Sequence, residues 1–169
     1  AADEAGATKM DRPEDFEVNP VNGKLYVALT NNKYRGANRE GKDDAPIAEW
    51  APIQENKNGM VLELDDDHTG EKFTWNLLLV CGDPEAAETY FGGFDKSKVS
   101  PISCPDNLAF DSQGNLWIST DGQPGKIGYG DALHKVTLEG RNRGRVEQFL
   151  SVPTDAETCG PVIHDRDNS

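Results

Sequence analysis

The chain has 169 residues, of which 36% are hydrophobic and 28% are charged, and its formal net charge is −13. That length suits one ordinary domain, and no apolar run approaches the roughly 20 residues that a membrane-spanning helix needs. A nucleic-acid binder needs a basic surface, whereas this chain has 30 acidic and 17 basic residues. We therefore expect neither a nucleic-acid nor a membrane partner. The acidic balance favours cation binding or a solvated acidic surface.

The first predicted unit spans residues 11–81 and consists of four strands. It opens with Arg12-Pro13-Glu14-Asp15, and Asn22-Gly23 supplies the positive φ of a hairpin turn. Its strands are rich in β-branched, leucine and aromatic residues and are predicted at residues 12–19, 23–29, 59–64 and 73–80.

The second predicted unit, residues 104–152, repeats the first. Pro13 and Pro105 are 92 residues apart, and each precedes an acid, a strand, a Gly-containing turn and a second strand. Its strands are predicted at residues 104–111, 114–120, 132–138 and 145–150. In the polar connection before it, residues 82–103, Asp83 predicts a capped short helix over 84–90.

A third unit is predicted to begin at residues 157–169, where Gly160-Pro161 again precedes apolar residues. Repeats of four antiparallel strands are typical of β-propeller blades. The sequence therefore predicts an all-β fold with about two four-stranded blades and the start of a third, all within one partial propeller domain, 1–169. Because propellers close with about 4 to 8 blades, we interpret the chain as a fragment. Its open blade edges and faces favour self-association.

Glu14 and Asp106 occupy the same position in the two repeats, just before the first strand. In a propeller the innermost strands line the central channel, so these carboxylates are expected to converge near the axis. Ca²⁺ prefers several oxygen ligands gathered from separate elements, and Asp15 and Asn107, in the next position, add two more oxygen donors. The alternative interpretation is that all four side chains only hold turns by accepting backbone hydrogen bonds.

Arg12 lies two residues before Glu14, on the same side of an extended chain. Its guanidinium is either the salt-bridge partner of the acids or a receptor for phosphate, which suits its bidentate geometry. The equivalent residue in the second repeat is Cys104, which we interpret as a buried thiol. The three histidines show no metal-ligand spacing.

Several motifs in the same order resemble the PhoX family of bacterial alkaline phosphatases, and the resemblance covers nearly the whole chain. They are Lys9-Met10-Asp11-Arg12-Pro13-Glu14-Asp15, residues 26–32, Ser103-Cys104-Pro105-Asp106-Asn107-Leu108-Ala109-Phe110-Asp111, residues 116–122, residues 149–153 and Glu157-Thr158-Cys159-Gly160-Pro161.

The resemblance implies a periplasmic or secreted phosphomonoesterase, a six-bladed propeller, and a site that holds calcium and iron near the channel. It further implies that Glu14 and Asp106 are metal ligands and that Arg12 binds the phosphate of a phosphate-ester substrate. The family's amino-terminal half, which supplies the remaining ligands, is absent, and Cys104 does not correspond to the family's iron-binding cysteine. We therefore expect this chain alone to have little or no phosphatase activity.

Two other functions are also compatible with the sequence. One is a non-catalytic calcium-binding or interaction propeller, and the other is a lactonase-type propeller hydrolase, which also gathers Asp, Asn and Glu around one calcium ion. Arg12 discriminates between the hydrolases, because phosphate recognition requires a cation and lactone hydrolysis does not.

Overall fold

The computed structural model describes residues 4–37, 45–67 and 69–165, which form two antiparallel β-sheets. The first sheet has the order β1-β2-β3-β4-β5 and the second the order β6-β7-β8-β9. The strands of the first sheet are β1 (Pro13–Val18), β2 (Leu25–Leu29), β3 (Met60–Asp65), β4 (Thr74–Val80) and β5 (Tyr90–Phe91). Those of the second are β6 (Pro105–Phe110), β7 (Leu116–Thr120), β8 (Ala132–Val136) and β9 (Val146–Ser151).

Helical structure in the described residues is confined to short pieces in connections. They are η1 (Lys96–Lys98), α1 (Pro124–Ile127) and η2 (Gly140–Asn142). No helix in this part of the chain is long and apolar enough to cross a membrane. The prediction of an all-β fold with two antiparallel sheets is confirmed, except that the first sheet has a fifth strand, β5.

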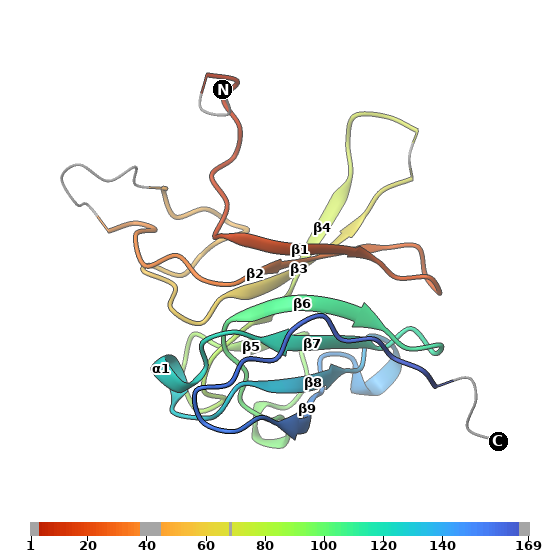
Figure 1. Cartoon of the computed structure of the whole chain (residues 1–169). Coiled ribbons are helices and arrows are strands. Elements are labelled where there is room, and N and C mark those ends of the chain that lie inside the picture. Colours follow the sequence, from red (N-terminus) through yellow and green to blue (C-terminus); the bar gives the residue numbers. More distant parts are fainter. Residues whose placement is uncertain (1–3, 38–44, 68, 166–169) are drawn as a thin grey trace.

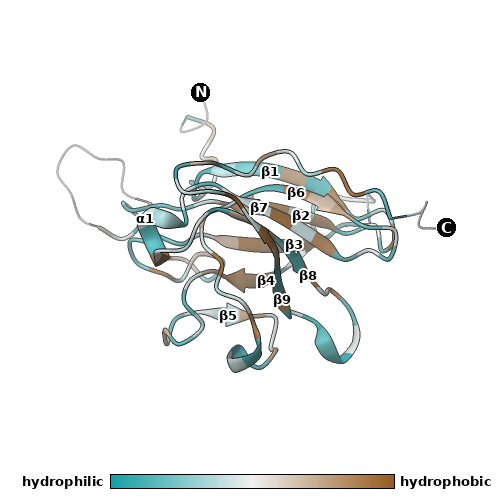
Figure 2. Cartoon of the chain, turned by 60° about the horizontal axis from the view of Figure 1, so that its bottom comes forward, coloured by the Kyte–Doolittle hydropathy of each residue, from teal (hydrophilic) through white to brown (hydrophobic). Residues whose placement is uncertain are grey.

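The two sheets stack face to face, and β6 contacts both β1 and β2 (Figure 1). Side chains alternate along each strand, so that Tyr26 and Ala28 of β2 point into the layer between the sheets while Val27 and Leu29 lie on the opposite face. Hydrophobic residues accordingly concentrate on the strands, and turns are hydrophilic (Figure 2). The core between the sheets includes Tyr26, Ala28, Val61, Leu79, Phe91, Leu108, Leu116, Ile118, Val136 and Val146.

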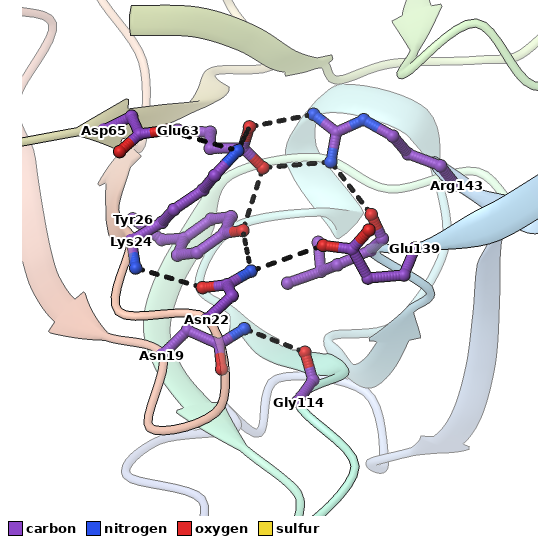
Figure 3. Close-up of polar contacts among 10 residues, drawn as sticks. Asn19, Asn22, Lys24, Tyr26, Glu63, Asp65, Gly114, Glu139 and Arg143 are labelled. Carbon is purple, nitrogen blue, oxygen red and sulfur yellow. Dashed lines mark hydrogen bonds and ion pairs between the residues drawn. The ribbon is translucent and has the colours of Figure 1, made fainter. Parts of the chain in front are cut away.

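A buried carboxylate joins the sheets at one end of this core (Figure 3). Glu63 of β3 is 2% exposed and receives two hydrogen bonds from Arg143, at 2.9 and 3.1 Å. Tyr26 and Lys24 donate to the same carboxylate at 2.8 and 3.1 Å. Burial opposes ionisation, but the hydrogen bonds from Arg143, Tyr26 and Lys24 outweigh it and lower the pKa of Glu63. The Glu63 carboxylate of the first sheet is thus paired with Arg143 from the connection between β8 and β9 of the second sheet. This ion pair fixes how the two sheets stack.

The helix predicted over residues 84–90 is wrong. Asp83 accepts hydrogen bonds from the amides of Glu85 and Ala86 and from the Thr89 hydroxyl, which makes a turn and no helix. Phe91 is fully buried in the core, and Tyr90 and Phe91 pair with the end of β4 as a fifth strand. The burial of Phe91 and the pairing of Tyr90 with Val80 therefore keep the end of this segment extended.

The predicted third unit, 157–169, stays a prediction. Its described part, residues 157–165, forms no strand but lies against the second sheet. Thr158 hydrogen-bonds the backbone of Thr120 and Ala132, and the amide of Gly160 donates to Asn107 at 2.8 Å.

Candidate metal and phosphate site

Three backbone corners with similar φ values precede prolines, two at the start of the two repeats and one in the segment predicted to begin a third. Arg12, Cys104 and Gly160 have φ values of 50°, 53° and 51°, and each is followed by Pro. The first two corners are closed by the same hydrogen bond. Thr30 donates its amide to the Arg12 carbonyl at 3.1 Å, and Asp121 donates to the Cys104 carbonyl at 3.1 Å. We name these two the Arg12 corner and the Cys104 corner.

Directly after each corner, a β-bulge interrupts the pairing of the first strand. Pro13 pairs with Leu29 but Asp15 pairs with Ala28, which leaves Glu14 as the extra residue. In the second repeat the register shifts between Pro105 and Leu108, the interval that contains Asp106. A bulge turns a side chain out of the regular alternation and is frequent next to active sites. The sequence repeat therefore extends to the local geometry of the two candidate metal ligands.

Arg12 and Glu14 form an ion pair of 2.9 Å at the surface, and the Arg12 side chain is 63% exposed. An exposed pair of this kind contributes only about 0–1 kcal/mol. The guanidinium is therefore free to leave Glu14 when a stronger anion is offered.

The acidic side chains around Asp106 act on one another. Burial first, and then the charges of Glu14, Asp121, Glu157 and Asp15, raise the pKa of Asp106 to about 6. Carboxylates from both repeats thus share one negative region. In the described residues, however, no three His, Cys, Asp or Glu side chains are close enough together to hold a metal ion.

Asp121 and Glu157 were missed in the sequence. Asp121 follows β7 and closes the Cys104 corner with its amide, and Glu157 lies three residues before Gly160. The signal in the sequence is that both residues lie next to a corner, and stacking of the repeats brings their charges close enough to act on Asp106.

Asp15 and Asn107 use their oxygens to join successive repeats. Asp15 accepts from the Leu108 amide at 2.8 Å, and Asn107 accepts from the Gly160 amide at 2.8 Å. Both oxygens thus accept backbone hydrogen bonds, as in the alternative interpretation, but from distant segments and not within a turn. Asp15 links the first repeat to the second, and Asn107 links the second repeat to the segment that follows it.

Cys104 is 1% exposed, and burial raises the pKa of its thiol. A thiolate is the form that binds metals, so this environment disfavours Cys104 as a ligand. The prediction of a buried thiol is confirmed.

Three comparisons place these features among known proteins. The family model of alkaline phosphatase PhoX matches residues 1–168. Among solved structures the chain is similar to Pseudomonas fluorescens PhoX in complex with vanadate, a transition state analogue, with 33% sequence identity and a TM-score of 0.74. That match covers 92% of this chain and 27% of the other, so the chain spans about a quarter of its length. No curated protein sequence matches the chain.

The family match covers nearly all of the chain, and the structural match extends over both sheets. The two sheets are consecutive blades of a β-propeller, and the chain belongs to the PhoX family of alkaline phosphatases.

Proposed function

We propose that this chain is the portion of a metal-dependent alkaline phosphatase that supplies Arg12, Glu14 and Asp106 to a phosphate-monoester site in the propeller channel. The observation that carries the proposal is the repeated corner and bulge. This geometry presents an acid at the same place in two adjacent blades, and Arg12 lies beside the first acid. A solved relative binds vanadate, which supports phosphate esters as the substrate class.

In this proposal Arg12 binds two phosphoryl oxygens. Its ion pair with Glu14 is exposed and weak, so exchange of the carboxylate for a doubly charged phosphate is favourable. The fork of the guanidinium fits two oxygens of one phosphate. Glu14, released from Arg12, is then free to bind a cation together with Asp106.

Calcium and iron are the cations that the family resemblance implies. Glu14 and Asp106 are hard oxygen donors in a region of accumulated negative charge, which fits Ca²⁺. For iron, this chain offers the same carboxylates and no exposed thiolate at Cys104. When bound, such cations stabilise charge on the phosphoryl oxygens as Lewis acids. In the complete protein, Glu14 and Asp106 would help to hold and orient them.

The described residues supply too few ligands to enclose a metal ion. We therefore expect that the 169-residue chain alone hydrolyses p-nitrophenyl phosphate slowly or not at all in the presence of Ca²⁺ and iron. Robust turnover that Glu14→Ala abolishes would mean that the chain contains a whole site.

The proposal is tested in the complete phosphatase of which we propose this chain to be a portion. Arg12→Met should raise KM for the phosphate ester and weaken vanadate inhibition by about 10- to 100-fold, the loss expected for charge-assisted hydrogen bonds. The matched control is Arg145→Met, which removes an exposed arginine paired with Glu147 at 2.8 Å. Equal KM and vanadate inhibition in Arg12→Met and the control would contradict the proposal.

The outer face of the first blade supports self-association or packing against a further blade as part of this proposal. A groove of about 870 Å³ runs over that face. Apolar side chains dominate its lining, among them Met10, Leu25, Val27, Leu62, Leu64, Phe73 and Trp75.

We also propose export to the periplasm or the medium, on family membership alone. Cell fractionation tests this proposal.

A further inference from the structure

Arg35 lies in the long connection between β2 and β3, and its charged side chain is only 1% exposed. A buried guanidinium needs partners for all its donors. Arg35 donates from Nε to Asp11 Oδ1 at 2.6 Å, from Nη1 to the Pro46 carbonyl and from Nη2 to the Lys9 carbonyl. Its guanidinium also lies 4.7 Å from the centre of the Trp50 ring.

These contacts gather two further segments of the chain around the charge of Arg35. Lys9 and Asp11 belong to the segment that leads into the Arg12 corner, whereas Pro46 and Trp50 lie later in the same connection as Arg35. Asp11 is itself 0% exposed and receives a further hydrogen bond from Asn32 at 2.9 Å. The residue directly before Arg12 is therefore held from two sides.

The Arg12 corner needs such support because its own residues provide little. A non-glycine residue in the left-handed region is disfavoured by about 1–2 kcal/mol, and a following proline restricts it further. Arg12 and Pro13 are both exposed, so packing does not fix them. We call the contacts of Arg35 with Asp11, Lys9 and Pro46 the Arg35 clamp. Besides the Thr30 amide that closes the corner and the pairing of Pro13 with Leu29, this clamp restrains the segment that leads into Arg12.

The Cys104 corner is held differently. Cys104 and Pro105 are buried, and Ser103, the residue that corresponds to Asp11, is held by neutral groups. Its amide donates to Gln123 at 2.9 Å and its hydroxyl to Asn58 at 2.9 Å. A charged clamp is thus present at the corner that carries the arginine and absent from its equivalent.

We propose that Arg35 is a positioning residue, which fixes the backbone of the Arg12 corner and thereby aims the Arg12 guanidinium and the Glu14 carboxylate at the phosphate site. The inference deepens the proposed function and rests on it for the role of Arg12. Arg35 itself does not reach the substrate. The clamp holds the Asp11 side chain and the Lys9 carbonyl, so that the backbone enters Arg12 in one direction and the side chains of Arg12 and Glu14 start from fixed positions.

The positional part is tested in the 169-residue chain by amide hydrogen exchange, without any activity measurement. The amide of Thr30 reports on the Arg12 corner and the amide of Asp121 on the Cys104 corner, because each donates to the corner carbonyl. Arg35→Met should lower protection at Thr30 by at least about tenfold relative to Asp121, since only one corner is released. An equal loss at both amides, or no loss at Thr30, overturns the proposal.

Two further variants keep the test decisive. Arg35→Lys retains the charge and reaches Asp11, but lacks the planar fork that bonds Lys9 and Pro46 at once. It should give an intermediate loss of protection at the Thr30 amide and no loss at the Asp121 amide. It replaces Arg35→Met as the test variant if Arg35→Met does not fold. Lys33→Met removes an exposed cation two residues away and should leave both amides unchanged.

The functional part is a double-mutant cycle in the complete phosphatase. If Arg35 acts through Arg12, Arg35→Met raises KM for p-nitrophenyl phosphate about tenfold or more in the parent, but adds little in the Arg12→Met background. A purely structural role would give the same loss in both backgrounds and overturns the inference. If Arg12→Met alone has no effect, the proposed function fails, while the exchange experiment still decides whether Arg35 positions the corner.

Discussion

The Arg12 corner and the Cys104 corner have nearly the same backbone and different environments. Their φ values are 50° and 53°, and the closing hydrogen bonds are both 3.1 Å long. Arg12 is 63% exposed, whereas Cys104 is 1% exposed. The repeat therefore sets the shape of each corner, and the side chain at one position decides whether the corner offers a charge to solvent or packs into the protein.

The largest expected loss of stability comes from a substitution at Gly59, which packs against residues of both corners. Gly59 has φ +80°, and a Cβ there would lie 2.3 Å from the Thr30 carbonyl oxygen and 2.8 Å from Pro105 Cδ. Gly59→Ala should cost about 4 kcal/mol or more in the free energy of unfolding, because backbone from both repeats must move. The matched control is Gly23→Ala, where φ is +74° but nothing lies within 4 Å, with an expected cost of about 1 kcal/mol. Denaturant unfolding measures both, and similar losses would contradict the close packing of the corners.

Exchanging the two corner residues sharpens the comparison. Cys104→Arg places a large cation in a buried position and should cost about 3 kcal/mol in the free energy of unfolding. Arg12→Cys removes an exposed ion pair and should cost less than about 1 kcal/mol. Thermal or denaturant unfolding of the two variants measures these two losses in the free energy of unfolding. Comparable destabilisation would show that the environments do not differ as described.

Acid should weaken the second blade more than the first. His134 of β8 is fully buried, and burial lowers its pKa to about 4 from 6.5. The unfolded chain binds more protons between these pH values, so stability falls as pH falls through this window, by about 3 kcal/mol in total. The protection factor of the Asp121 amide, which is corrected for the intrinsic pH dependence of exchange, should therefore fall on acidification more than that of the Thr30 amide.

Substitution of one histidine at a time provides the control for this pH effect. His134→Leu should remove this contribution to the slope of stability against pH between about 6.5 and 4, whereas substitution of the exposed His164 should not. A slope that persists unchanged in His134→Leu would assign the acid sensitivity to other groups.

The smallest effect concerns the links between successive repeats. Asp15→Ala leaves the amide of the buried Leu108 without its acceptor and should cost about 2 kcal/mol in the free energy of unfolding. Asn107→Ala releases the amide of Gly160, which is exposed and can bond to water, and should cost about 0.5 kcal/mol. Chemical denaturation resolves the difference, and an equal cost would remove the distinction between the two links.

The sequence predicts the repeated elements well because strands and turns are local. Asn22-Gly23 ends a hairpin by its own conformational preference, and the Pro13 and Pro105 segments repeat in structure as they do in sequence. The short strand at Tyr90–Phe91 was not predictable in this way, since it forms only because Phe91 enters the core and the backbone pairs with β4.

The candidate site was predictable only in part for the same reason. Glu14 and Asp106 stand out by their equal positions in the repeat, but Asp121 and Glu157 become their neighbours only when the repeats stack. The buried pair of Asp11 and Arg35 joins residues 24 positions apart through an irregular connection, where no periodic pattern exists to indicate it.

The central claim is that Glu14 and Asp106, from two blades, belong to one cation site beside Arg12. A Ca²⁺ titration of the 169-residue chain, followed by amide chemical shifts, tests it most directly because this method detects weak binding. We predict that the amides of Glu14 and Asp106 respond with a single apparent Kd, and that Asp106→Asn suppresses the response at Glu14. Independent responses at the two residues, or shifts confined to the acidic turn at Asp65–Asp67, would contradict the claim.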